Sequence, residues 1–109
     1  MNWIPLQSES QLQDIKTKSS ERPQVIFKHS TRCGISAVAK NRLEKAGTPQ
    51  GVDFYYLDLI NNRSLSNKVA EEFKVRHESP QILIIRNGQC TYDESHMSIS
   101  MDDIEVQVL

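Results

Sequence analysis

The stretch Gln24-Val25-Ile26-Phe27-Lys28-His29-Ser30-Thr31-Arg32-Cys33-Gly34-Ile35-Ser36 decides how this chain folds. Its first part, Gln24–Lys28, is a short run rich in β-branched and aromatic residues, which predicts a buried strand. The loop His29–Arg32 follows, and apolar residues at helical spacing then predict a helix over residues 33–46. A cysteine, Cys33, therefore stands where a core strand has just ended and a helix begins.

The other elements are predicted from caps, turns and apolar spacing. In the 33–46 helix the spacing is kept by Ile35, Val38, Ala39, Leu43 and Ala46. We expect a short strand at Trp3–Leu6, a helix from Ser8 to about Lys18, a strand over 52–59, a helix capped at Asn61-Asn62, strands over 81–86 and 89–93, and a terminal helix after Ser100 that turns Ile104 and Val108 inward. Asn87-Gly88 favours a two-residue type I′ hairpin turn.

This order of elements predicts the fold class. A strand–helix–strand crossover followed by an antiparallel hairpin and a helix gives a mixed sheet that is covered on both faces. The uninterrupted apolar run Ile82–Ile85 agrees, because a strand covered on both sides does not alternate. The order resembles that of thioredoxin-like proteins. We predict one α/β domain over residues 1–109, with a central sheet of four to five strands and helices on both faces.

Composition excludes several classes of function. The 109 residues include 13 Lys and Arg against 14 Asp and Glu, so no basic excess exists to neutralise a nucleic-acid backbone. No apolar run approaches the roughly 20 residues of a membrane-spanning helix, and the first residues lack the pattern of a signal peptide. Two cysteines are too few for a secreted disulfide framework. We expect a cytoplasmic protein that binds neither nucleic acid nor membrane.

Cys33 is the candidate nucleophile. The start of a helix presents unpaired N–H groups and the positive end of the helix dipole, which favours a thiolate over a thiol. Lys28, His29, Arg32 and Lys40 lie near it in the sequence and could add positive potential. The alternative is a buried cysteine that acts as a small hydrophobic residue.

Ser36 stands where a dithiol oxidoreductase would carry its second cysteine, in Cys33-Gly34-Ile35-Ser36. Without a neighbouring thiol, Cys33 would exchange with a small thiol, carry it, and be released by a second thiol. The Ser36 hydroxyl could donate a hydrogen bond to the Cys33 thiolate. It could equally bond to the backbone in the first helical turn.

Ser79-Pro80 opens the strand that would lie beside Cys33. A trans proline is the ordinary form at the start of a strand. The thioredoxin-like placement instead favours a cis bond, with the backbone of Ser79 exposed to pair with a substrate.

The remaining cysteine and the histidines show no metal-site spacing. Cys90 should pair across the hairpin from Ile85, too far from Cys33 for a disulfide, which needs Cα atoms within about 7 Å. His29 is the best candidate to assist ionisation of Cys33, and His77 could face the same groove. Each of these histidines, and His96, could also be an ordinary loop residue.

The segment Phe27–Ser36, together with Ser79-Pro80-Gln81, resembles the monothiol bacilliredoxins, small thioredoxin-like proteins of the bacillithiol system. The resemblance implies removal of bacillithiol, as co-substrate, from mixed disulfides on oxidised cytosolic proteins, with no tightly bound cofactor. Cys33 would match the single nucleophilic cysteine and Pro80 the proline that faces it. We attach no separate role to Gly34. Bacillithiol carries an anionic malate, so Lys28, His29 or Arg32 could help to bind it.

Two other functions fit the same residues. Cys33-Gly34-Ile35-Ser36 is similar to the Cys-Gly-Phe-Ser motif of monothiol glutaredoxins, so the chain could carry an iron–sulfur cluster. Such a cluster needs four thiolate ligands, which here would require a dimer and two small thiols. The chain could also be a redox sensor whose cysteine is modified without turnover.

Overall fold

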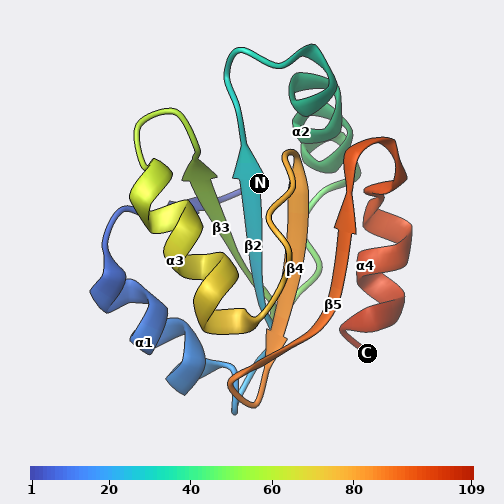
Figure 1. The fold of residues 1–109 in the computed structure, drawn as a ribbon. Coiled ribbons are helices and arrows are strands. Elements are labelled where there is room, and N and C mark those ends of the chain that lie inside the picture. The colour runs from blue at the N-terminus through green and yellow to red at the C-terminus, as the bar shows by residue number, and fades with distance from the viewer.

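A five-stranded sheet runs through the computed structural model, which describes residues 1–109 (Figure 1). The elements are β1 (Trp3–Pro5), α1 (Glu9–Lys18), β2 (Gln24–His29), α2 (Gly34–Ala46), β3 (Asp53–Asp58), α3 (Arg63–Phe73), β4 (Gln81–Arg86), β5 (Gln89–Ser95), a 3₁₀ turn η1 (His96–Ser98) and α4 (Met101–Gln107). The strand order is β1-β3-β2-β4-β5. β1, β3 and β2 are parallel, whereas β4 and β5 run antiparallel to their neighbours. The predicted α/β fold with a mixed sheet is confirmed.

Helices cover both faces of the sheet (Figure 1). α1 and α3 pack on one face, where the buried side chains are Leu6, Leu12, Ile15, Ile26, Tyr55, Leu57, Leu65, Val69, Phe73, Leu83 and Ile85. α2 and α4 pack on the other, over Val25, Phe27, Ala39, Leu43, Val52, Phe54, Ile82, Ile84, Ile99, Met101 and Ile104. All six residues of β2 are buried, as expected of a strand covered on both sides. No helix is long and apolar enough to cross a bilayer.

The inward face of α2 differs from the sequence interpretation. Ser36, Ala39 and Leu43 are buried at the i, i+3 and i+7 positions. Ile35 and Val38, which keep helical spacing, are 47% and 46% exposed. Apolar spacing predicted the wrong buried face because the first buried residue of α2 is polar. This residue, Ser36, is accommodated in the core by the hydrogen bonds described below.

Two local signals were accurate. The Ser100 Oγ accepts a hydrogen bond from the Asp103 N–H at 3.2 Å, so α4 begins at the predicted cap. Ile104 is buried, but Val108 is only partly so. At the hairpin, Arg86 pairs with Gln89 across a two-residue turn.

The hairpin turn depends on Gly88, whose φ is +77°. An alanine there would place a Cβ in the left-handed region, at a cost of roughly 1–2 kcal/mol. We expect Gly88→Ala to lower the free energy of unfolding by that amount in urea titrations. Gly34 is the matched control, because it begins a helix with open space around it. Equal losses for Gly88→Ala and Gly34→Ala would contradict this account of the turn.

Candidate active site

The helix α2 starts at the end of the sheet where β2 stops and β4 starts (Figure 1). Cys33 directly precedes α2. It is half-buried and is the N-cap residue of α2, with extended backbone angles. Its N–H donates to the Ser30 carbonyl at 3.1 Å, and its carbonyl accepts from the Ala37 N–H at 3.1 Å. The amides of residues 34–36 precede the first hydrogen bond of the helix, so their N–H groups remain free. The positive end of the α2 dipole therefore lies at Cys33.

The Ser79–Pro80 bond is cis, as the thioredoxin-like placement led us to expect. Gln81 pairs with Lys28 of β2, so Pro80 lies one register step further, beside the end of β2 from which the Cys33 loop departs. The N–H and C=O of Ser79 form no hydrogen bond within the chain. Cys33 and the unpaired backbone of Ser79 therefore occupy the same end of the sheet.

Ser36 and His29 do not contact Cys33 through a hydrogen bond, which corrects one of the two interpretations of Ser36. The buried Ser36 Oγ accepts from the Ser30 N–H at 3.1 Å and lies 2.6 Å from His29 Nδ1. His29 is itself only 5% exposed, and burial, followed by the charge of Lys40, lowers its pKa. The Ser36 hydroxyl thus fixes the loop before Cys33, and His29 is neutral at pH 7.

Replacing Ser36 with Ala should destabilise the fold. The change leaves the Ser30 N–H and the His29 ring nitrogen without their partner, at a cost of roughly 1–3 kcal/mol. Ser79→Ala is the matched control, because the Ser79 Oγ is buried but makes no hydrogen bond. We expect denaturant titrations to show a loss for Ser36→Ala and little change for Ser79→Ala. The reverse order would contradict the assigned hydrogen bonds.

The basic residues that are close to Cys33 in the sequence lie in different environments in the structure. Lys28 is fully buried on the α3 face, where its Nζ lies 3.2 Å from the Ser66 carbonyl and 3.1 Å from His77 Nδ1. Burial lowers the pKa of Lys28 to about 8. Lys28 therefore cannot contact a bound thiol, and His77 points to Lys28 instead of an open groove. Arg32 remains exposed beside Cys33.

His96, which the sequence suggested is an ordinary loop histidine, contacts the loop that carries Pro80. Its backbone adopts the left-handed region (φ 56°), and its N–H donates to the Pro80 carbonyl at 3.0 Å. Its Nε2 lies 3.5 Å from Glu78 Oε1. η1, which His96 begins, also packs against α2. His96 therefore ties β5 to the loop that carries Pro80. No feature of the sequence predicts a left-handed backbone conformation at this histidine.

Cys90 lies near the opposite end of the sheet from Cys33. It sits beside the hairpin turn, opposite Ile85 as predicted, and both cysteines are free. Its Sγ donates to the Tyr92 carbonyl at 3.3 Å, and burial raises the pKa of its thiol. These contacts keep Cys90 protonated and make it a poor nucleophile.

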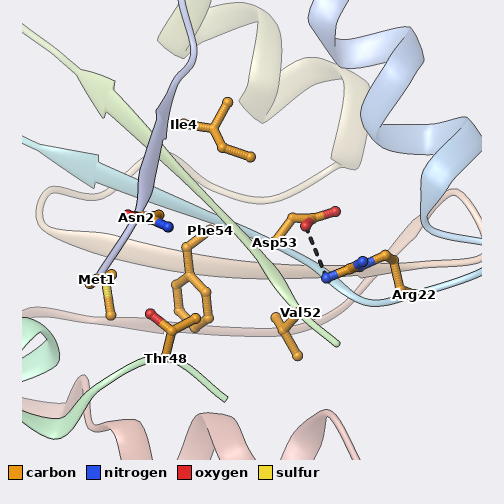
Figure 2. A pocket seen from close by; sticks show the side chains of 8 residues that line it. All are labelled: Met1, Asn2, Ile4, Arg22, Thr48, Val52, Asp53 and Phe54. Carbon is orange, nitrogen blue, oxygen red and sulfur yellow. Dashed lines mark ion pairs between the residues drawn. The ribbon is translucent and has the colours of Figure 1, made fainter. Parts of the chain in front are cut away.

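The largest cavity, about 550 Å³, lies away from Cys33 at the start of β3 (Figure 2). Its charged residues already satisfy each other, since Arg22 Nη2 lies 3.2 Å from Asp53 Oδ1. The other Asp53 oxygen accepts from Gln24 Nε2 at 2.7 Å. The two charged side chains that line the cavity are therefore paired with each other.

A comparison with known protein families covers most of the chain. The family described as monothiol bacilliredoxin BrxC matches residues 4–104. The chain belongs to the monothiol bacilliredoxin family. Membership in this family, together with the fold, supports a thiol redox function.

Solved structures agree on the fold of this bacilliredoxin family member. A structure described as a candidate oxidoreductase with a thioredoxin fold is 30% identical, with a TM-score of 0.82 over 94% of this chain and 90% of its own. Thioredoxin from Trypanosoma brucei brucei is 19% identical, with a TM-score of 0.77 over 97% of this chain and 88% of that one. Thioredoxin of Malassezia sympodialis is 18% identical, with a TM-score of 0.75 over 98% and 88%.

Proposed function

We propose that this protein is a monothiol thiol–disulfide oxidoreductase that removes bacillithiol from mixed disulfides on oxidised cytosolic proteins. Cys33 is the attacking thiolate. The observation that carries the proposal is the position of Cys33 at the start of α2, at the same sheet end as Pro80 and with Ser36 in place of a second thiol. Membership in the bacilliredoxin family supports bacillithiol as the small thiol.

The reaction proceeds in two exchanges. The Cys33 thiolate attacks the bacillithiol sulfur of the mixed disulfide, so a Cys33–bacillithiol bond forms and the client sulfur leaves as a thiolate. A second bacillithiol thiolate then attacks the Cys33-bound bacillithiol. Bacillithiol disulfide leaves, and Cys33 returns as a thiolate. One disulfide is consumed and one is formed, so no further oxidant or reductant is required.

The environment of Cys33 supports release by an external thiol. Ser36 cannot form a disulfide, and Cys90 lies near the hairpin turn, away from Cys33. The free N–H and C=O of Ser79 are suited to pair with an extended segment of a client protein. Such pairing would hold the client beside Cys33 without requiring a particular client sequence.

Arg32 is our candidate for the anionic malate of bacillithiol, because it is exposed and adjacent to Cys33, whereas Lys28 is buried. An exposed charge contributes about 0.2–1 kcal/mol, so Arg32→Gln should slow bacillithiol removal by about 1.4- to fivefold in low salt. Arg42→Gln makes the same charge change further along α2 and should have little effect. The difference should shrink in high salt. An unchanged rate for Arg32→Gln in low salt would remove this contact.

The choice of small thiol is tested with one client protein loaded in turn with bacillithiol, glutathione or cysteine. The release of free client thiol is followed with the same small thiol as reductant in each case. We expect bacillithiol to be removed at least about tenfold faster than the others, a difference of about 1.4 kcal/mol. Equal rates would contradict specificity for bacillithiol and leave a general thiol oxidoreductase. Failure of all three would exclude exchange.

A further inference from the structure

Lys28 is a buried cation with no acidic partner. It lies in the middle of the sheet, on β2, with Leu57 of β3 on one side and Gln81 of β4 on the other. Its side chain has no measurable exposure, and its Nζ contacts only the Ser66 carbonyl and His77 Nδ1. A lysine is rarely buried unpaired, because desolvation of the ammonium is costly. Its place in the core therefore calls for an explanation.

Gln81, the cross-strand partner of Lys28, is equally buried and points to the same face. Its Nε2 donates to the Arg76 carbonyl at 2.9 Å, and its Oε1 accepts from the Glu78 N–H at 3.4 Å. Lys28 holds the intervening residue, His77, at 3.1 Å. The neighbouring buried side chains of Lys28 and Gln81 therefore contact three consecutive residues, 76–78, of the segment that leads to Ser79.

The segment 76–79 is held in place through side chains. None of its N–H or C=O groups bonds to another backbone group. Two ion pairs involve Glu78: one to Arg76 at 3.8 Å, internal to the segment and exposed at Arg76, and one to His96 Nε2 at 3.5 Å. The Ser66 Oγ also lies 3.4 Å from His77 Nδ1. Beyond Ser79, the Pro80 carbonyl is fixed by the His96 N–H. Lys28 and Gln81 make the closest of the contacts to residues 76–79, at 3.1 Å to His77 and 2.9 Å to the Arg76 carbonyl, so the position of the Ser79 backbone depends on them.

The protonation states suit this contact. Burial lowers the pKa of His77, and the charge of Lys28 lowers it further, so His77 is neutral at pH 7. Its Nδ1 can then accept a hydrogen bond from the Lys28 ammonium. Hydrogen bonds to a charged donor are stronger than those between neutral groups.

We propose that Lys28 is a positioning residue for exchange at Cys33, which acts through His77 and alongside Gln81 to hold the segment 76–79 so that the Ser79 backbone meets the client protein. This inference rests on the proposed oxidoreductase function. Lys28 does not touch the reacting sulfurs, since its side chain is enclosed on the α3 face.

The test compares two reactions of the same cysteine. Exchange with a bacillithiolated protein requires the client to be positioned, whereas alkylation by iodoacetamide requires only the Cys33 thiolate. We expect Lys28→Met to slow exchange by about tenfold or more, because small misplacements near reacting groups are costly. Alkylation should change by less than about twofold, since the nucleophile itself is untouched. Reference measurements use Cys90→Ser backgrounds, so that only Cys33 reacts.

His77 variants separate this contact from a general loss of packing. His77→Leu removes the acceptor and should slow exchange as Lys28→Met does. His77→Asn keeps an acceptor oxygen near the position of Nδ1 and should restore exchange to within about threefold of wild type. The double variant Lys28→Met with His77→Leu should exchange no more slowly than the slower of the two single variants. The reason is that both substitutions remove the same contact between Lys28 and His77. His77→Leu also keeps the test available if Lys28→Met does not fold.

The outcomes are distinct. Wild-type exchange rates in both Lys28→Met and His77→Leu would overturn the positioning role. Equal losses in exchange and alkylation would also overturn it, because they would place Lys28 in activation of the thiolate. If the wild-type protein does not react with any mixed disulfide, the proposed function itself is contradicted. In that case, unchanged NMR relaxation of residues 76–79 in Lys28→Met would overturn the role of Lys28 separately.

Discussion

Replacing Cys33 with Ser is expected to lower the rate of disulfide exchange at least about a thousandfold, because the attacking sulfur is lost and nothing nearby replaces it. Cys33 is half-buried and is the N-cap residue of α2, next to N–H groups that have no partner within the helix. The serine hydroxyl is a far weaker nucleophile at neutral pH. The measurement is the initial rate at which free client thiol appears from a mixed disulfide.

Cys90→Ser is the matched control for this prediction. Burial raises the pKa of the Cys90 thiol, and its Sγ is occupied with the Tyr92 carbonyl. The variant should therefore exchange at within about twofold of the wild-type rate. A large loss in Cys90→Ser, with its fold intact, would mean that the second thiol takes part in turnover and that the monothiol scheme is wrong.

The free energy of unfolding is expected to depend on pH through Lys28. Its pKa is about 8 in the folded protein and near the ordinary 10.5 in the unfolded chain. Between these values the unfolded chain binds a proton that the folded protein does not, so stability rises as pH increases from 8 to 10.5. The full difference corresponds to roughly 3 kcal/mol. This contribution is lost as the pH falls from 10.5 to 8, and it does not change further below pH 8.

Lys28→Met removes this titration and provides the comparison. Urea titrations of both proteins near pH 7 and above pH 10 should show that wild type gains roughly 3 kcal/mol more than the variant. Other groups that titrate in this range, such as Tyr55 and Tyr56, are present in both proteins and cancel in the difference. Parallel changes in the two proteins would mean that Lys28 keeps an ordinary pKa when folded.

Local chemistry explains which parts of the fold could be predicted from the sequence. Asn87-Gly88 specifies its turn through backbone angles that few residues adopt, and Ser100 caps its helix through one side-chain bond. The order of elements then leaves few ways to form a covered mixed sheet. The same order predicted the cis bond at Pro80.

The environment of the candidate site was harder to predict, because it depends on contacts between distant residues. Lys28 meets His77, which lies 49 residues away, and in the sequence it looks like one more basic residue near Cys33. Ser36 faces His29 instead of Cys33 because the buried stripe of α2 begins at Ser36. Apolar spacing alone did not reveal this, because it treats serine as a surface residue.

Intact mass spectrometry tests directly whether Cys33 accepts bacillithiol from a mixed disulfide. Reduced wild-type protein and Cys33→Ala are each mixed with a bacillithiolated test protein, and all masses are recorded before any second thiol is added. We predict a bacillithiol adduct on the wild type alone, with the test protein released as a free thiol. An absence of transfer from a folded protein with reduced Cys33 would contradict the account and favour cluster carriage or redox sensing.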